Sequence, residues 1–331
     1  MPLTWEGVNL NLKTTFRLAT STSDQRHNVI VHLAEGLGEA AAVPQFNDTQ
    51  AGLMADLARA ADGVRDDPYQ IEDILTSLPP VSQAARAAID MALHDLLSKR
   101  LGQPLYRLLG LNPDRLPPTS FTIAIDEPER MAERARQSGY PILKLKLGSA
   151  DDEAIVRAVR LATSARLRVD ANAGWTRDQA ARLIPRLAEY DLEFIEQPLA
   201  ATDLDGLRWL RSQKLGVPIF ADEGAKTARD VARQAGLVDG VVVKLMKAGG
   251  IREALRAISV ARAHDMRIML SCMIETSVGV TAAAHLAPLC DYADLDGPLL
   301  IGNDPYEGLR FDGAIFTLPN RPGLGVAKRN R

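Results

Sequence analysis

Two lysines, Lys144 and Lys146, stand two residues apart inside the apolar run 142–147. On a β-strand the side-chain period is two, so both ammonium groups point to the same face. Burying two like charges side by side is costly unless a strongly anionic group lies nearby. Taken alone, the pair is typical of a solvated edge strand, where lysines discourage pairing with another chain. The pair gains chemical meaning only if anions face it.

Candidate anions follow later apolar segments, at the point where each segment ends. Asp170, Glu196 and Asp222 each end one such segment, and Lys244 ends the next. A single Asp or Glu at such a place is more often a helix N-cap or a loop carboxylate. Three of them at equivalent positions would point hard oxygen ligands at one place, which suits Mg²⁺. The pattern therefore predicts a Mg²⁺ site with lysines on either side.

A barrel would bring these residues together. After Pro117-Pro118, short apolar segments alternate with helical patterns, and no Gly-x-Gly-x-x-Gly opens any of the helices, which argues against a Rossmann fold. Eight parallel strand signals with intervening helices indicate a (β/α) barrel, whose catalytic groups lie at the C-terminal ends of the strands. The candidate strands are 120–125, 142–147, 166–170, 192–196, 217–222, 240–244, 267–272 and 291–295.

The first hundred residues predict a separate α+β unit. A polar stretch, 20–26, separates its first two strands, and its Ser and Thr content predicts a mobile loop that could serve as a lid. The most regular helical pattern is 82–100, which Gly102 ends. Strands are expected at 3–12 and 28–34, and helices at 48–62, 68–77 and 82–100.

Composition limits the class of protein. The 331 residues are enough for a barrel-sized domain plus a smaller one. The formal net charge is −3 and no basic tract is present, so we expect neither nucleic acid nor a membrane surface as a partner. No apolar run approaches the roughly 18 residues of a membrane span. The cysteines, Cys272 and Cys290, lack metal-type or disulfide spacing, which suits a reducing cytoplasm.

Five short motifs resemble those of the enolase superfamily and, within it, the muconate-lactonising subgroup. They are Lys144-Leu-Lys146, Asp170-Ala-Asn172, Glu196-Gln-Pro198, Asp222-Glu-Gly224 and Lys244-Leu-Met-Lys247-Ala-Gly249-Gly250. The helix at 85–96 and the segment 271–276 are also similar, so the resemblance covers nearly the whole chain. It implies a modified (β/α)7β barrel of the TIM type with an N-terminal α+β capping domain. The expected boundaries are 1–116 for the capping domain, 117–304 for the barrel and 305–331 for a C-terminal segment that returns to the capping domain.

The resemblance also implies a reaction step, removal of a proton from the carbon next to a carboxylate. Removal builds a second negative charge on that carboxylate as an enediolate, which a divalent metal stabilises. By resemblance Asp170, Glu196 and Asp222 bind Mg²⁺. Asn172 and Glu223 belong to the same motifs and are expected to support these ligands.

The lysines take separate roles by the same resemblance. Lys146 is the base on one face of the substrate, and Lys244 is the acid or base on the other face. Lys144 stabilises the enediolate by its charge. Lys247 falls past the strand end and is interpreted as a helix or loop lysine. A lysine on each face suits racemisation or epimerisation, although cycloisomerases and a dehydratase of the subgroup use the same lysines.

The motif Asp294-Leu295-Asp296 discriminates between these candidate reactions. It resembles the Asp-x-Asp of dipeptide epimerases, in which two carboxylates hold the α-ammonium group of the substrate. If the segment is a strand, residues i and i+2 share a face, so both carboxylates can reach one cation. The alternative is a loop turn before Gly297. This motif favours a dipeptide epimerase with a small-molecule dipeptide as its partner.

Substrate specificity is expected to depend on the stretch 20–26. Relatives that act on Ala-Glu carry an arginine near Ser21, and this chain offers Arg26 further on. Arg26 could pair with an acidic side chain, Asp24 would favour a cationic one, and a neutral loop would favour an apolar one. The alternatives to the epimerase are an N-acylamino acid racemase, a muconate-type cycloisomerase, and a barrel that binds without catalysis. We also expect a homo-oligomer.

Overall fold

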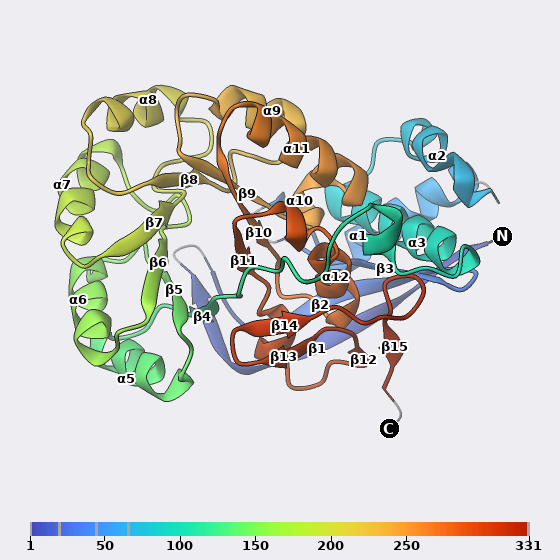
Figure 1. Ribbon diagram of the computed structural model, residues 1–331, viewed down its shortest axis with the longest axis horizontal. Helices are drawn as coiled ribbons and strands as arrows, with labels where there is room; N and C mark the ends of the chain where they lie inside the picture. The colour runs from blue at the N-terminus through green and yellow to red at the C-terminus, as the bar shows by residue number, and fades with distance from the viewer. Residues whose placement is uncertain (1, 19–20, 44–45, 65–66, 330–331) are drawn as a thin grey trace.

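The computed structural model describes residues 2–18, 21–43, 46–64 and 67–329. A ring of parallel strands surrounded by helices lies beside a three-stranded antiparallel sheet with its own helices (Figure 1). Hydrophobic side chains from both parts form one large buried core. No helix within the described ranges is both long and apolar enough to cross a membrane.

The barrel sheet has its strands in sequence order, and neighbouring strands pair in parallel. A parallel bridge between Thr119 and Ala293 joins the first strand region to the last. The strands are β4 (Phe121–Ile123), β5 (Ile142–Lys146), β6 (Arg166–Asp170), β7 (Leu192–Glu196), β8 (Ile219–Ala221), β9 (Gly240–Val243), β10 (Arg267–Ser271) and β11 (Tyr292–Asp294). This arrangement confirms the predicted barrel.

Helices follow each of the first seven barrel strands, as a (β/α)7β barrel requires. They are α5 (Pro128–Ser138), α6 (Asp152–Ala162), α7 (Arg177–Ala188), α8 (Leu204–Ser212), α9 (Ala228–Gln234), α10 (Leu245–Ala248), α11 (Ile251–Ala263) and α12 (Ser277–Ala284). Thr176 and Thr227 begin α7 and α9 with capping boxes, in which the cap hydroxyl and the third side chain each accept a backbone N–H.

The capping domain contains a strand β3 that packs closely on the helix α3. Its strands are β1 (Leu3–Leu18), β2 (Ser21–Leu33) and β3 (Gly36–Ala40), and its helices are α1 (Gln50–Ala60), α2 (Ile71–Ser77), α3 (Gln83–Arg100) and α4 (Leu105–Leu108). The Ser82 hydroxyl accepts the N–H of Ala85 and begins α3. The sequence period thus placed this helix within one residue of its observed start.

The prediction of a loop at 20–26 is wrong. β1 and β2 continue beyond the predicted strands and pair with each other from Leu3 and Leu33 to Leu18 and Ser21. The main-chain ladder supports these polar residues as strand, because pairing does not require apolar side chains when one face of the hairpin is open to solvent. Thr20 lies outside the described residues. The hairpin extends toward β4 and β5, where Ile125 donates its N–H to the Arg17 carbonyl (Figure 1).

The C-terminal residues form small strands beside the capping domain. Leu324 donates its N–H to Asp95 of α3 over 2.7 Å, and Leu105 donates its N–H to the carbonyl of Gly323. The strands are β12 (Tyr306–Glu307), β13 (Arg310–Asp312), β14 (Ile315–Thr317) and β15 (Ala327–Lys328). The exact domain boundaries stay a prediction.

Candidate active site

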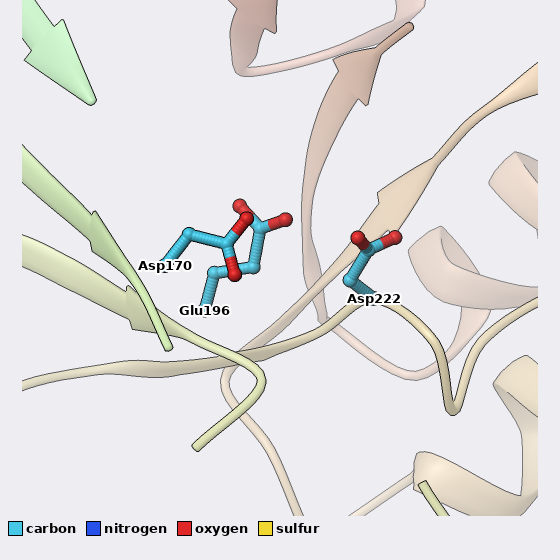
Figure 2. A group of neighbouring side chains, drawn as sticks. All are labelled: Asp170, Glu196 and Asp222. Atoms are coloured by element: carbon cyan, nitrogen blue, oxygen red, sulfur yellow. The ribbon is translucent and has the colours of Figure 1, made fainter. Parts of the chain in front are cut away.

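Three buried carboxylates meet at one end of the barrel (Figure 2). Asp170 ends β6, Glu196 ends β7 and Asp222 follows β8, so three successive strands supply them. One oxygen from each lies within 4.8 Å of the others. Burial of three acids together is unfavourable without positive charge. The triad offers the hard oxygen ligands that Mg²⁺ prefers.

Glu196 tests whether a metal fits this place. Its side chain is fully buried, and neither carboxylate oxygen has a hydrogen-bond partner among the described residues. One oxygen does lie 2.8 Å from the Lys144 ammonium, as an ion pair without hydrogen-bond geometry. Burial and the charge of Asp170 raise the pKa of Glu196 well above its usual value. A bound divalent cation would satisfy both oxygens, so the residues fit a metal centre.

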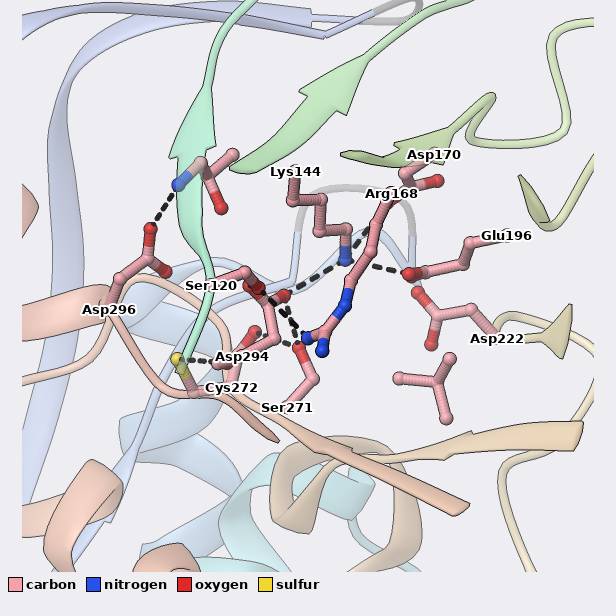
Figure 3. Close-up of polar contacts among 12 residues, drawn as sticks. Ser120, Lys144, Arg168, Asp170, Glu196, Asp222, Ser271, Cys272, Asp294 and Asp296 are labelled. Carbon is pink, nitrogen blue, oxygen red and sulfur yellow. Dashed lines mark hydrogen bonds and ion pairs between the residues drawn. The ribbon is translucent and has the colours of Figure 1, made fainter. Parts of the chain in front are cut away.

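Lys144, the first lysine of the pair, faces a cluster of carboxylates. Its Nζ lies 2.8 Å from Glu196, 2.9 Å from Asp294 and 3.3 Å from Asp170 (Figure 3). Burial alone would lower the pKa of Lys144, but Asp294 and Glu196 raise it well above its usual value. Lys144 is therefore a permanent cation at the centre of the acidic cluster.

Lys146 and Lys244 reach the cluster from different sides. Lys146, at the end of β5, lies 2.6 Å from Asp170, and Lys244, just after β9, lies 2.7 Å from Asp222. Three strands separate β5 from β9 around the ring. Burial opposes charge on Lys244, but Asp222 raises its pKa above the usual value. Burial likewise favours the neutral form of Asp170, but Lys146 keeps its pKa below the usual range.

Lys247 has a larger part in the site than its sequence position indicated. It lies on the short helix α10, as expected, but it is 1% exposed and its ammonium donates to the carboxylate and the carbonyl of Asp222 and to the carbonyl of Val242. Burial lowers the pKa of Lys247. Sequence reasoning missed this contact, because helical spacing does not indicate that α10 turns its lysine into the barrel.

Amide side chains support the acidic residues from the strand-end turns. Asn172 donates its side-chain amide to Asp170 and to Glu223, at 3.3 Å in both cases, and its N–H to Asp170. Gln197, which sequence reasoning named only as part of a motif, accepts the N–H groups of Asp222 and Gly224. Both residues have positive φ angles, 44° and 40°. Such backbone strain is typical of residues that a site holds in place.

Asp294 and Asp296 differ in their surroundings. Asp294 accepts from Lys144, and also from the hydroxyls of Ser120 and Ser271 (Figure 3). Burial would raise its pKa, but Lys144 lowers it to about 2. Asp296 accepts the N–H of Thr122 over 2.6 Å, and burial with the Asp294 charge raises its pKa to about 7.

The prediction that Asp294 and Asp296 share a face because both lie on one strand is wrong. β11 ends at Asp294, and Asp296 has φ −84° and ψ 2°, so strand alternation does not relate their side chains. Both nevertheless border the same cavity. The sequence could not indicate that Ser120 and Ser271 would donate to Asp294, or that the buried Arg168 would lie beside Ser120, because these residues are far apart in the sequence.

A cavity opens at the barrel mouth, and residues of both the barrel and the capping domain line it. Lysines and carboxylates line its floor, whereas its upper wall is mainly apolar and comes partly from the capping domain. Arg26 of β2 lines it, but Ser21 and Asp24 do not. Cys272 also borders it. The wall residues include Phe16, Leu18, Val43, Phe46, Met273, Ile274 and Leu300.

Family models match both parts of the chain. Residues 4–110 match the N-terminal domain of mandelate racemase / muconate lactonizing enzyme, and residues 127–330 match the enolase C-terminal domain-like family. The chain belongs to the enolase superfamily. The second match alone covers more than half of the sequence, which agrees with the barrel and with the acidic triad at its mouth.

Individual relatives are similar over their full length. The L-Ala-D/L-Glu epimerase of Bacteroides thetaiotaomicron is 39% identical over 99% of this chain and 88% of its own. The structure of a dipeptide epimerase from Enterococcus faecalis V583, complexed with Mg and L-Leu-L-Tyr, has a TM-score of 0.93 at 33% identity, over 98% of this chain and 99% of its own. The structure of an N-succinyl Arg/Lys racemase from Bacillus cereus has a TM-score of 0.89 at 29% identity, over 99% of this chain and 96% of its own.

Proposed function

We propose that this protein is a Mg²⁺-dependent dipeptide epimerase that inverts the α-carbon of the C-terminal residue of an L,L-dipeptide. The observation that carries the proposal is the placement of Lys146 and Lys244 on opposite sides of the buried acidic triad. Two relatives named for dipeptide epimerisation, similar over the full length, support the substrate class.

The two lysines divide the proton transfers between them. Lys146, as a neutral amine, takes the α-proton from one face of the substrate, and Lys244, as an ammonium, returns a proton to the other face. Each lysine ends in the state that the other had at the start, so the reverse reaction uses the same pair with exchanged roles. Because the two lysines come from β5 and β9, one substrate carbon can lie between them.

Charge at the barrel mouth lowers the cost of the intermediate. A divalent cation held by Asp170, Glu196 and Asp222 supplies positive charge to the substrate carboxylate when bound. Lys144 adds a fixed cation beside the triad, where the second negative charge develops. Its charge is held by three carboxylates, so no reorganisation is needed when the substrate ionises.

The Asp294–Asp296 pair is the proposed ammonium site. Asp294 is already paired with Lys144, whereas the carboxylate of Asp296 accepts from Thr122 and forms no ion pair within the described residues, so it is the one available for a substrate cation. This division keeps the ammonium of the substrate apart from the proton-transfer lysines. It distinguishes a dipeptide from a substrate that carries no positive charge.

Hydrogen exchange tests the reaction class. The protein is incubated with Mg²⁺ and a library of L,L-dipeptides in deuterated water, and α-deuterium is followed by mass spectrometry and NMR. Incorporation with appearance of the L,D-epimer is expected for at least one dipeptide. If no mixture incorporates deuterium, the proposal is wrong.

Half-reactions test the two-lysine assignment. Lys244→Ala is expected to slow interconversion by at least about 100-fold, the usual minimum contribution of a general acid or base, while one epimer still exchanges its α-proton. Lys328→Ala, which changes an exposed lysine on β15, serves as the control. Undiminished epimerisation by Lys244→Ala would remove Lys244 from the mechanism.

An N-acylamino acid racemase is the second candidate, because a racemase of N-succinyl amino acids has a similar structure. Its substrate has no free α-ammonium, so Asp296→Asn separates the two functions. The dipeptide epimerase is expected to lose activity in this variant, whereas a racemase of acylated substrates would keep it. A cycloisomerase would instead be revealed by turnover of a muconate without α-proton exchange, and a non-catalytic barrel by binding without turnover.

We infer a cytoplasmic location and a homo-oligomeric state. Cys272 and Cys290 are both free thiols, which suits a reducing compartment. Light scattering coupled to size-exclusion chromatography measures the mass of the assembly. A mass of one chain, 35.9 kDa, at micromolar concentration would contradict the second inference.

A further inference from the structure

Two buried glutamates from different domains lie side by side behind the active-site wall. Glu39 belongs to β3 of the capping sheet, and Glu275 belongs to the segment between β10 and α12 of the barrel. They are 0% and 1% exposed. A Cβ built on Gly279 would meet one oxygen of each, at 2.2 Å for Glu275 and 3.0 Å for Glu39. Both carboxyl groups therefore border the same small space, which a glycine keeps open.

Glu39 is saturated with donors. It accepts from the side chain of Asn28, from the N–H and the hydroxyl of Thr276, and from the N–H of Gly279, at 2.6–3.1 Å. These donors include N–H groups at the beginning of α12, where the helix dipole favours a negative charge. Burial raises the pKa of Glu39, but these donors oppose the rise, so Glu39 is the member of the pair better placed to remain ionised.

Glu275 is in the opposite situation. One oxygen accepts the N–H of Met273 over 2.7 Å, but the other is buried and has no hydrogen-bond partner within the described ranges. None of the described lysines or arginines forms an ion pair with either glutamate. Two ionised carboxylates at this spacing would repel each other without compensation, whereas one proton on Glu275 turns its orphan oxygen into a donor.

We propose that Glu275 keeps a proton beside the ionised Glu39, and that this proton keeps the capping domain docked on the wall of the active-site cavity. The same contact region holds that wall in place, because Asn28 also donates its side-chain amide to the Ile274 carbonyl over 3.0 Å. Ile274 and Met273 line the cavity. Glu275 is a positioning residue in this scheme, and its link to substrate affinity rests on the proposed function.

Other titratable groups face the pair without replacing its proton. Lys244 lies on the Glu275 side, but it is paired with Asp222. The thiol of Cys272 and the phenol of Tyr306 also face the pair, and burial raises the pKa of both groups, to about 12 for Tyr306. Burial and the charge of Glu39 raise the pKa of Glu275 to about 8. The proton is therefore expected to leave in the mildly alkaline range.

Infrared spectroscopy tests the proton directly, without substrate. The difference spectrum between the wild type and Glu275→Gln is expected to contain a carboxylic-acid band at pH 7 that disappears as the pH rises through about 8. Glu275→Gln suits the test because its side-chain oxygen can still accept from the Met273 N–H, while the group that titrates is removed. Glu129→Gln, an exposed change on α5, is the control and should leave the band unchanged.

Unfolding equilibria give a second measurement. In the folded protein Glu275 keeps its proton up to a pH of about 8, whereas an unfolded glutamate releases it near pH 4.3. The contribution of this group to the free energy of unfolding is therefore complete below pH 4.3 and is lost as the pH rises to about 8. In that window the unfolding equilibrium constant of the wild type should rise about tenfold per pH unit relative to Glu275→Gln. If the variant does not fold, Glu39→Gln must move the midpoint of the acid band to lower pH.

Kinetics connect the pair to the cavity. Above pH 8 the KM of the wild type for a dipeptide is expected to rise while kcat is held, and Glu275→Gln should flatten the rise. Parallel pH profiles of stability for the wild type and Glu275→Gln, with no difference in the acid band, would overturn the proposed proton on Glu275. An absence of turnover with every dipeptide would overturn the proposed function alone, because neither the spectra nor the unfolding data need a substrate.

Discussion

At the scale of single residues, Arg26 is the side chain through which the capping hairpin gives the cavity a charge. It lines the cavity beside Phe16 and Leu18, and no ion pair of Arg26 occurs among the described residues. Burial lowers the pKa of Arg26. An unpaired guanidinium at an apolar wall binds a carboxylate in a bidentate manner with good geometry. The side chain of an acidic C-terminal residue offers such a carboxylate.

Arg26→Gln should therefore change substrate preference more than catalysis. We expect the kcat/KM ratio of L-Ala-L-Glu to L-Ala-L-Gln to fall by about 10- to 100-fold, the equivalent of one charged hydrogen bond of about 1.5–3 kcal/mol. Arg17→Gln, an exposed arginine on β1, is the matched control. An unchanged ratio would mean that Arg26 does not contact the substrate side chain.

Asp296 should make substrate binding depend on pH. Its pKa is raised to about 7 by burial and by Asp294, so it is neutral below that pH and ionised above it. Only the ionised form attracts an ammonium group. The KM of a dipeptide is thus expected to fall as the pH rises from 6 to 7.5, and Asp296→Asn should show a higher KM without this slope. A slope that persists in the variant would assign the titration to another group.

At the scale of elements, β3 can lie against α3 only because glycines face the helix. A Cβ at Gly38 would lie 2.0 Å from the Ala88 carbonyl, and one at Gly36 would lie 2.3 Å from the Ala92 carbonyl. Gly38→Ala should destabilise the protein by about 1–3 kcal/mol or more, as overpacking against backbone does. Denaturant unfolding measures this loss. The control is Gly302→Ala, an exposed position where the nearest atom to an added Cβ is the Asn11 carbonyl oxygen at 3.7 Å, so little change in stability is expected.

The elements also show what a single sequence can reveal. Barrel strands were predictable, because they are short apolar runs and several of them end in or directly precede a functional residue, as Ile142–Lys146 does. The β1–β2 hairpin was not, since its far end carries polar residues that pair through the main chain. Lys247, Ser120 and Glu275 acquire their roles from neighbours that are far away in the sequence, and local periodicity contains no information about such neighbours.

At the scale of the whole molecule, the described side chains at the barrel mouth, counted with every one ionised, carry an excess of two negative charges, which one divalent cation would offset. Four described lysines surround the site, and the described carboxylates around it are more numerous by two. The lysines are Lys144, Lys146, Lys244 and Lys247, and the carboxylates are Asp170, Glu196, Asp222, Glu223, Asp294 and Asp296. Arg26 then adds one further positive charge, which agrees with a substrate that carries one extra negative charge.

The same balance predicts that the metal stabilises the fold. A ligand that binds only the folded state at 100 times its Kd adds about 2.7 kcal/mol to the free energy of unfolding. Mg²⁺ should therefore raise the Tm of the wild type, and Glu196→Gln should remove most of the shift, since it takes away the ligand whose two oxygens lack hydrogen-bond partners in the described structure. The control Glu129→Gln should retain the Mg²⁺-dependent rise in Tm. The three ligands lie at the ends of successive strands, so a bound cation would hold those strand ends together. Mg²⁺ is therefore also expected to slow hydrogen exchange in β6, β7 and β8. A Tm shift of equal size in Glu196→Gln would place the ion elsewhere.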